Sequence, residues 1–197
     1  EGVIEAKTVE NKNGVIRLEG GDNGVVAVRG TVDASTQGQG AGGAITITGQ
    51  YVGLFDNAAI TASGENGGGT ILIGGDYQGS NPNIQNATAT YIDKTATINA
   101  DAITSGSGGK VIVWSNDSTK FYGGISAKGG SQSGNGGFVE TSGHYLDVAG
   151  ATVNASAANG NTGTWLLDPY NVTISNTASG SGTFDGGNPN IWTPSLT

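Results

Sequence analysis

The stretch "GGKVIVWSNDSTKFYGGISAKGGSQSGNGGFVETSG", residues 108–143, contains one full repeat unit and the start of the next. It begins with a glycine pair and a short β-branched run, "KVIVW", and returns to a glycine pair and a strand-like run, "FVETS", 28 residues later. Between them lies "ISA", a β-branched residue followed by a polar residue and alanine. Short β-branched runs between glycine-rich turns are typical of strands, and motifs in a fixed order indicate a repeat architecture.

The same two motifs recur along the chain in the same order. The glycine before each expected first strand is Gly14, Gly24, Gly43, Gly69, Gly109, Gly137 or Gly163. The β-branched, polar, alanine motif begins at Val32, Ile60, Ile98, Ile125 and Val153. The last four glycine intervals are 26, 40, 28 and 26 residues, which indicates a unit of about 26 residues with two or three short strands.

Alternation within each first strand separates two faces. The second and fourth residues after the glycine, such as Ile71 and Ile73 or Val111 and Val113, form a β-branched stripe that we expect to face inward. Strands this short cannot bury an apolar face alone, so the units must stack on one another. The sequence therefore predicts an all-β chain folded as a parallel β-helix, or solenoid.

The 40-residue interval indicates an insertion at residues 76–91, "DYQGSNPNIQNATATY". It adds about 14 residues rich in turn formers, and we expect a loop or small hairpin that protrudes from one corner. This segment either lengthens a turn only or carries function, as protruding loops often do. The coils are expected to occupy residues 1–175, and the turn-rich residues 176–197 are expected to form a further coil or a boundary.

The composition excludes several classes of function. Glycine supplies 37 of the 197 residues and charged residues only 12%, but recurring Val, Ile and Thr runs favour an all-β fold over disorder. The net charge of −8 argues against nucleic-acid binding, which needs clustered Lys and Arg. The chain has no cysteine and no long apolar stretch, so neither disulfides nor a membrane-spanning helix are expected. It begins within the pattern, at "EGVIEA", as a fragment of a longer protein would.

The run that ends in "GGFVETSGHYLDV" (residues 136–148), followed by "GTWLLDPYNVTIS" (163–175), resembles the large exoproteins of two-partner secretion systems. These are the filamentous-haemagglutinin-like and high-molecular-weight adhesins of Gram-negative bacteria. The resemblance covers roughly residues 42–175. It implies a right-handed β-helix rod that is exported by an outer-membrane transporter and is secreted or displayed on the cell surface. Members act as adhesins, biofilm matrix proteins, haem-acquisition proteins or contact-dependent toxins.

The family's N-terminal secretion domain carries an "NPNG" motif, whereas this chain has "NPNI" at Asn81 and at Asn188. We therefore expect both to be turns and the chain to lie in the body of the rod, downstream of the secretion domain. The expected function is a structural rod segment that extends adhesive or binding elements. The alternatives are a ligand-binding module for a host glycan or a haem-carrier protein through the inserted loop, and a polysaccharide lyase or hydrolase. Expected partners are the transporter, a host receptor or glycan, and other copies in fibres.

No catalytic, cofactor or metal site is expected. The run "GQGAGG" (residues 38–43) has the letters of a dinucleotide fingerprint, but a strand follows it where a helix is required. "GGDNG" (20–24) and "GGDYQG" (74–79) have calcium-ligand residue types at the wrong spacing. A glycosidase needs two carboxylates on one outer face, whereas the outward third position is mostly apolar. That row contains Glu5, Arg17, Ala27, Thr46, Leu72, Ile112, Glu140 and Leu166.

The same row suggests an interface. Leu72, Ile112 and Leu166, near Phe138, are expected to form an outward apolar ladder, and exposed apolar patches usually mark interfaces. Either the inserted loop covers this ladder or another protein does, and burial by the loop would exclude the partner.

Four sequons, at Asn86, Asn116, Asn154 and Asn171, are possible glycosylation sites, although the composition alone accounts for about that number. The single histidine, His144, aligns with Gln50 of an earlier repeat, and Tyr145 aligns with Tyr51. His144 is therefore expected to be a polar surface residue and not a catalyst. The tryptophans are expected to lie in the core or to cap it, with Trp165 inward and Trp114 at the end of its strand; stacking of Trp114 or Trp192 on a sugar is the alternative.

Overall fold

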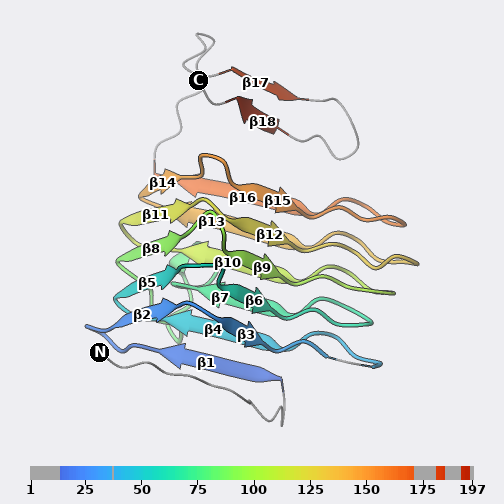
Figure 1. Ribbon diagram of the computed structural model, residues 1–197, viewed down its shortest axis with the longest axis horizontal. Helices are drawn as coiled ribbons and strands as arrows, with labels where there is room; N and C mark the ends of the chain where they lie inside the picture. Colours follow the sequence, from blue (N-terminus) through green and yellow to red (C-terminus); the bar gives the residue numbers. More distant parts are fainter. Residues whose placement is uncertain (1–13, 37, 171–180, 185–191, 196–197) are drawn as a thin grey trace.

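The computed structural model describes residues 14–36, 38–170, 181–184 and 192–195. Its main body is a stack of coils, each with three short strands that pair with their counterparts in the neighbouring coils (Figure 1). All of these pairings are parallel. The predicted all-β fold, a parallel β-helix, is confirmed.

The three sheets form the long faces of the stack. The first sheet contains β1 (Val15–Glu19), β4 (Ala44–Thr48), β7 (Thr70–Ile73), β10 (Lys110–Trp114), β13 (Phe138–Gly143) and β16 (Thr164–Pro169). The second contains β2 (Val25–Val28), β5 (Tyr51–Leu54), β8 (Ala89–Ile92), β11 (Ser118–Phe121) and β14 (Tyr145–Asp147). The third contains β3 (Thr31–Asp33), β6 (Ala59–Thr61), β9 (Thr97–Asn99), β12 (Gly124–Ser126) and β15 (Thr152–Asn154).

Two more strands, β17 (Ser181–Phe184) and β18 (Trp192–Ser195), pair antiparallel with each other and form a separate sheet. The predicted boundary between residues 175 and 176 lies outside the described residues, so it stays a prediction.

The register follows the motif alignment. In the first sheet, Ile71 pairs with Ile45 on one side and Val111 on the other, and Val139 pairs with Val111 and Trp165. In the third sheet, all five β-branched, polar, alanine motifs stand in one column, Val32, Ile60, Ile98, Ile125 and Val153.

One alignment was wrong. The run after Gly24 forms β2, in the second sheet, where Ala27 pairs with Gly53, so Ala27 does not belong to the outward row of the first sheet. First and second strands are both β-branched runs, and local sequence does not separate two strands of the same coil.

The core is a column of aliphatic side chains that stack coil upon coil. Ile45, Ile71 and Val111 from the first sheet are fully buried, as predicted, and Leu54 and Ile92 join them from the second. Each such side chain contributes about 1.5–3 kcal/mol of burial free energy. At the last described coil, Trp165 is half-buried and Leu167 is exposed, because β16 pairs with β13 on one side only among the described residues.

A glycine-rich arm connects each third strand to the first strand of the next coil (Figure 1). In each arm, the N–H of the glycine that precedes the first strand donates to the carbonyl of the motif alanine. These bonds are Gly43 to Ala34 (2.8 Å), and Gly69 to Ala62, Gly109 to Ala100, Gly137 to Ala127 and Gly163 to Ala155 (2.7 Å each). Both sequence motifs are thus halves of one joint that closes the arm at its base.

Both glycines of a pair are required because neighbouring backbone lies too close for a side chain, as the first glycine of the pair shows. A Cβ on Gly108 would lie 2.0 Å from the carbonyl oxygen of Ala127 in the next coil, and a Cβ on Gly136 would lie 1.8 Å from that of Ala155. Only glycine allows this close backbone approach. The arms also bond to one another, for example through the N–H of Gly108 to the carbonyl of Asn135 (2.8 Å). The sequence predicted turns here, and the structure shows a hydrogen-bonded layer.

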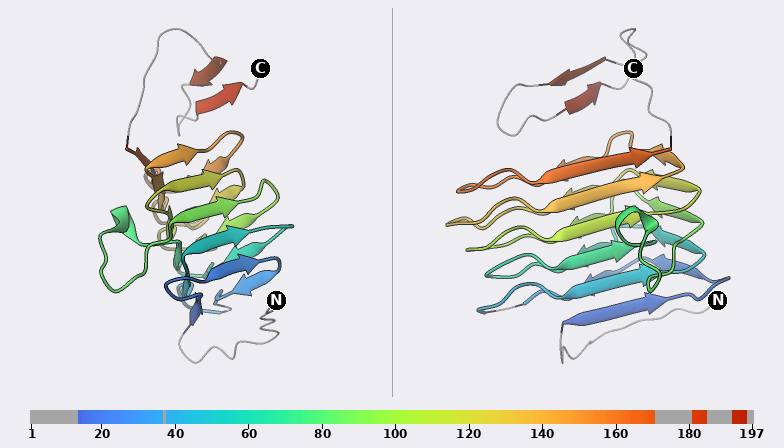
Figure 2. Two further views of the ribbon diagram at one scale, coloured as in Figure 1. Left: turned by 90° about the vertical axis from the view of Figure 1, so that its left-hand side faces the viewer. Right: turned by 180° about the vertical axis from the view of Figure 1, so that it is seen from behind.

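The connection between β7 and β8, residues 74–88, is the insertion predicted from the 40-residue interval. Other described coils join the first sheet to the second by one to five residues. This segment, which we call the strap, contains the short 3-10 helix η1 (Tyr77–Gly79) and lies over the first sheet (Figure 2). The predicted end of the insertion at Tyr91 was too late, because Ala89, Thr90 and Tyr91 belong to β8. The sequence "NATATY" is too polar to be recognised as a strand.

Candidate functional site

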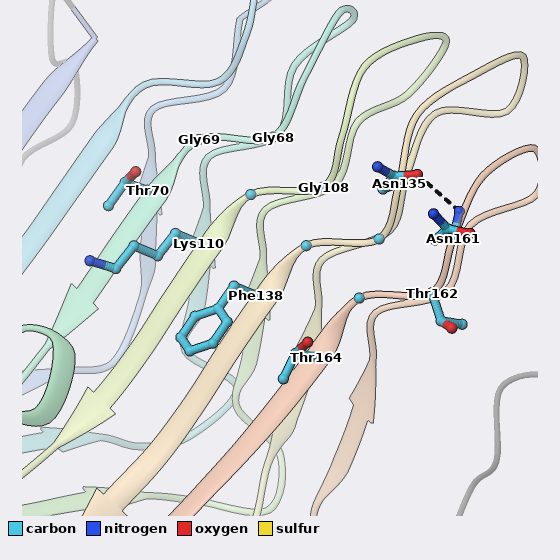
Figure 3. A pocket seen from close by; sticks show the side chains of 14 residues that line it. Gly68, Gly69, Thr70, Gly108, Lys110, Asn135, Phe138, Asn161, Thr162 and Thr164 are labelled. Carbon is cyan, nitrogen blue, oxygen red and sulfur yellow. Dashed lines mark hydrogen bonds between the residues drawn. The ribbon is translucent and has the colours of Figure 1, made fainter.

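A shallow groove of about 550 Å³ crosses the bases of four arms (Figure 3). Its floor is the bare backbone of the glycine pairs, and Lys110, Phe138 and Asn161 stand beside it. Apart from Lys110 its lining is uncharged, and the Lys110 amino group is paired with Asp76 of the strap at 2.6 Å. The groove therefore contains no acid–base pair for catalysis.

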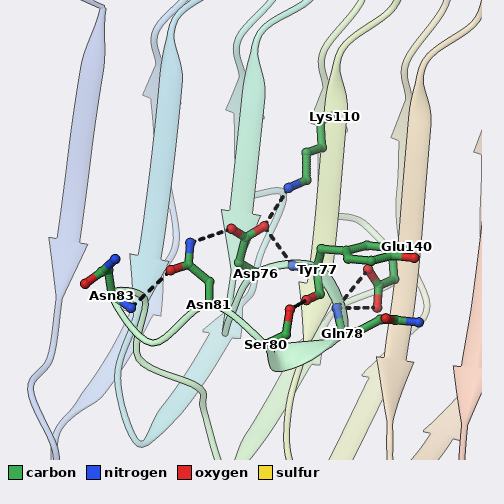
Figure 4. Close-up of polar contacts among 8 residues, drawn as sticks. All are labelled: Asp76, Tyr77, Gln78, Ser80, Asn81, Asn83, Lys110 and Glu140. Atoms are coloured by element: carbon green, nitrogen blue, oxygen red, sulfur yellow. Dashed lines mark hydrogen bonds and ion pairs between the residues drawn. The ribbon is translucent and has the colours of Figure 1, made fainter.

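Asp76 fixes the start of the strap (Figure 4). Its carboxylate accepts hydrogen bonds from the backbone N–H of Tyr77 (2.7 Å), the Asn81 amide (2.8 Å) and the Lys110 ammonium (2.6 Å). Burial alone would raise the pKa of Asp76, but the bonds from Asn81, Lys110 and Tyr77 outweigh it and lower that pKa below its ordinary value. Asp76 is therefore an ionised anchor between the strap and β10.

The next strap residues form turns. The N–H of Ile84 donates to the carbonyl of Asn81 at 3.2 Å, and the N–H of Asn83 donates to the Asn81 side chain at 3.0 Å. The predicted turn at the first "NPNI" is confirmed, and the second, at Asn188, lies outside the described residues. Further along, the Gln85 amide donates to the carbonyl of Gly21 in the first described coil (3.0 Å), so the strap also reaches backward along the stack.

Glu140 is the buried charge of the site. It occupies the outward third position of β13, yet it is 0% exposed, because the strap lies on it (Figure 4). The backbone N–H of Gln78 donates to both carboxylate oxygens, at 3.1 and 3.3 Å. Gln78 has a left-handed backbone conformation, with a φ of 52°, which is unfavourable for a non-glycine residue. Burial raises the pKa of Glu140, and the nearby Asp168 carboxylate adds to the rise.

The predicted interface is largely covered by the chain itself. Leu72 is 7% exposed and Ile112 is 0% exposed, so neither side chain is available to a partner while the strap is in place. Phe138 is half-buried and packs against the edge of Tyr77 with ring centroids 5.8 Å apart. Leu166 is also half-buried. Of the two explanations for the outward ladder, the structure therefore favours cover by the inserted segment.

Trp114 lies under the strap and is half-buried. A Cβ on Gly79, which has a positive φ of 59°, would lie 2.6 Å from its indole ring, so the strap backbone rests directly on the ring. Sequence reasoning missed Gln78 and Gly79. Glu140 could have been identified from the sequence, because it is a charged residue in a row of mostly apolar outward residues.

The second sheet carries an aromatic ladder that sequence reasoning also missed. Phe55 stacks on Tyr91 (5.4 Å between centroids), and Tyr91 meets the edge of Tyr122 (5.9 Å). The Arg29 guanidinium lies 4.9 Å from the centroid of Phe55. The hydroxyl of Tyr122 donates to Asp147 at 2.8 Å, which together with burial raises the pKa of Tyr122 to about 12. These ring contacts and Arg29 join consecutive coils to one another.

The remaining predicted positions lie apart from the strap anchor. His144 is exposed and stacks on Tyr170 at 4.6 Å, in agreement with a polar surface role. Tyr145 and Tyr51 stand in the same column of the second sheet, as the alignment predicted.

Of the sequons, Asn116 and Asn154 are exposed. The side chain of Asn86 instead donates to the carbonyl of Gly79 within the strap (2.8 Å). Asn171 and Glu5 are outside the described residues, and no side-chain description applies to Trp192.

No group of three or more histidine, aspartate or glutamate side chains is arranged to hold a metal ion in the described ranges. In the same part of the chain, no helix is long and apolar enough to cross a membrane.

The fold and the strap define the class of the chain as a parallel β-solenoid with one inserted segment docked on its first sheet. No protein-family model matches the chain, and no curated protein sequence matches it. Among solved structures, it is similar to the crystal structure of the HMW1 secretion domain from Haemophilus influenzae, with 38% sequence identity and a TM-score of 0.66. The match covers 78% of this chain and 39% of the other, so this chain spans less than half of the length of that domain.

Proposed function

We propose that the chain is a structural segment of a secreted exoprotein of the two-partner type, exported through an outer-membrane transporter of a Gram-negative bacterium. The single observation that carries this proposal is the 38% identity to the HMW1 secretion domain over 78% of the chain. The solenoid supports it, because stacked coils give a stiff rod that extends binding elements away from a cell. Adhesion at the cell surface is the finer part of the proposal.

The similarity also bears on where the chain lies in its parent. The sequence placed it in the body of the rod, downstream of the secretion domain, whereas the similar structure is itself a secretion domain. The comparison therefore supports a location within or beside a secretion domain more than the predicted one.

The export part can be tested in a Gram-negative host that produces the transporter of the parent system. The chain is placed behind a signal peptide, alone or preceded by the parent sequence upstream of it, and the amount in the medium is measured with and without the transporter. Transporter-dependent release in at least one arm is expected. Equal release without the transporter in both arms would refute the proposal, and release of the chain alone would identify it as part of the secretion module.

A second candidate function is ligand binding through the strap. The observation in its favour is that the strap's outer surface remains accessible, with Tyr77, Pro82 and Asn83 exposed. Binding to host glycans on an array, or to a haem-carrier protein, should then be lost when residues 76–86 are replaced by a short glycine linker. Binding that survives this replacement would exclude the strap as the ligand site.

We also propose that the chain is not an enzyme. A β-helix lyase or hydrolase needs two carboxylates that reach the substrate from one outer face. In the outward third row of the described first sheet, the carboxylate is Glu140, which is sealed under the strap. Release of sugar from a polysaccharide by the purified chain would contradict this proposal.

A further inference from the structure

The contact between the strap and β13 has too few hydrogen bonds for a charged group. Closing the strap removes the Glu140 carboxylate from water completely, and one N–H, that of Gln78, serves both of its oxygens. A buried carboxylate needs several donors to compensate for lost hydration. The ionised form of Glu140 is therefore poorly compensated when the strap is closed and well hydrated when it is open.

The hydroxyl of Ser142 can serve either protonation state of Glu140. Ser142 lies two residues further along the same face of β13 and interacts with the Glu140 side chain. As a donor to the ionised carboxylate it lowers the pKa of Glu140, and as an acceptor it can bind the O–H of the protonated form. Burial acts more strongly in the opposite direction, so the pKa of Glu140 is raised even with this hydroxyl beside it.

Two neighbouring charges affect the pKa of Glu140 in opposite directions. Asp168 of β16 repels the ionised carboxylate. Lys110 of β10 attracts it, but its ammonium is already paired with Asp76 of the strap at 2.6 Å. The two carboxylates at this contact thus have opposite environments. Asp76 of the strap has three donors, one of them cationic, whereas Glu140 of β13 has two uncharged donors, the N–H of Gln78 and the hydroxyl of Ser142, and a like charge beside it.

We infer that strap docking is linked to proton uptake by Glu140, so that the strap closes more tightly when Glu140 is protonated. On acidification from neutral pH, Glu140 takes up its proton before Asp76 does, and the strap tightens. At lower pH, Asp76 also becomes neutral, its bond to Lys110 weakens, and the strap loosens again. The strap therefore covers Leu72 and Ile112 most tightly in the acidic pH range where Glu140 is protonated and Asp76 is still ionised. Above and below this range the strap opens more often.

Hydrogen–deuterium exchange of the intact chain tests this inference. Protection factors, corrected for the intrinsic pH dependence of exchange, are measured for peptides covering residues 74–88 between about pH 4.5 and 8. One proton linked to opening changes protection by at most about tenfold per pH unit. We expect strap protection to rise as the pH falls from 8, while peptides covering β12 in the third sheet stay constant.

The Glu140→Gln variant should abolish the pH dependence of strap protection, because it carries no titrating group at this position. The matched control is Asp117→Asn, an exposed acidic residue in the β10–β11 connection, which should leave the wild-type profile unchanged. Strap protection that is constant or rises with pH in the unaltered chain would overturn the inference, as would a wild-type profile in Glu140→Gln. If Glu140→Gln does not fold, the strap and β12 peptides of the unaltered chain decide the question by themselves.

Discussion

The outward faces of the first and second sheets are protected in two different ways. On the first sheet, the strap covers Leu72, Ile112 and Glu140, so both faces of the central strands are buried. On the second sheet, the outward face is covered by its own side chains, and Phe55, Tyr91 and Tyr122 remain half-exposed. The comparison teaches that an outward position in a solenoid belongs to the core wherever a distant segment lies on it.

The largest effect on stability is expected at an inward position, because the core column lies between the sheets and is shared by them. Ile71→Asp places an unpaired charge in the core column and should cost at least about 4 kcal/mol of unfolding free energy, measured by urea denaturation. Thr164→Asp, at an exposed site of β16, is the control and should change the free energy by less than about 0.5 kcal/mol. Equal midpoints for the two variants would show that the inward assignment is wrong.

Ile112→Ala sharpens the contrast between the sheets. If the strap makes the outward face of β10 a true core, this variant should lose about 2–4 kcal/mol, close to the loss in the inward variant Ile73→Ala. The same urea titrations provide the measurement. A loss below about 1 kcal/mol for Ile112→Ala alone would mean that the strap does not cover this face in solution.

Asp76→Asn weakens the anchor of the strap without touching the aromatic ladder. Losing the charge on an acceptor with three donors should cost about 1–2 kcal/mol at neutral pH. Because the folded-state pKa of Asp76 is lowered, its contribution is present above its ordinary value of 3.8 and is lost as the pH falls through the folded-state value. The stability difference between the wild type and Asp76→Asn should therefore shrink below about pH 3.8, as measured by denaturation at several pH values. A difference that grows on acidification would contradict the assignment.

Tyr122→Phe tests the ladder of the second sheet. An ultraviolet titration of tyrosinate absorbance should contain a component near pH 12 in the wild type, and the variant should lack it. Tyr51→Phe, at an exposed position without this bond, is the control and should retain that component. If Tyr122→Phe leaves the high-pH component intact, the hydroxyl does not bond to Asp147 in solution.

The smallest effect is expected at the end of the same ladder. Arg29 forms an exposed ion pair with Asp56 at 3.0 Å and lies over Phe55. Exposed pairs contribute little, so Asp56→Asn should change the unfolding free energy by less than about 0.5 kcal/mol in thermal denaturation at low salt. Arg29→Ala also removes the contact with the ring and should cost about 0.5–1 kcal/mol. Equal effects would show that the ring contact adds nothing to the ion pair.

The coil register was predictable because it is local. Each glycine-led first strand and each alanine motif appears in one unit and repeats in the next. Glycine is needed before the strand because a Cβ on Gly109, for example, would lie 2.1 Å from the carbonyl oxygen of Gly69. The second strands were harder, since "VVAV", "YVGL" and "STKF" share no pattern, and this led to the misplacement of the run after Gly24.

The site was predictable only in part. The insertion was visible as a long interval, and cover of the apolar row by that insertion was one of two explanations. Which residues hold the strap could not be predicted, because the decisive contacts join residues far apart in sequence: Gln78 to Glu140 spans 62 positions and Asp76 to Lys110 spans 34. Such pairs depend on how many coils lie between them, which a single-sequence pattern does not specify.

The joint between the glycine pair and the motif alanine has a consequence for how such a chain can change. From Ala62 onward, the arms contain between six and nine residues between these two partners, and all close with the same 2.7 Å bond. The spacing of the coils therefore does not depend on the length of the arms. Residues can be added or removed at an arm tip without displacing the strands on either side, so the arm tips are the natural places to graft new peptide segments onto this scaffold.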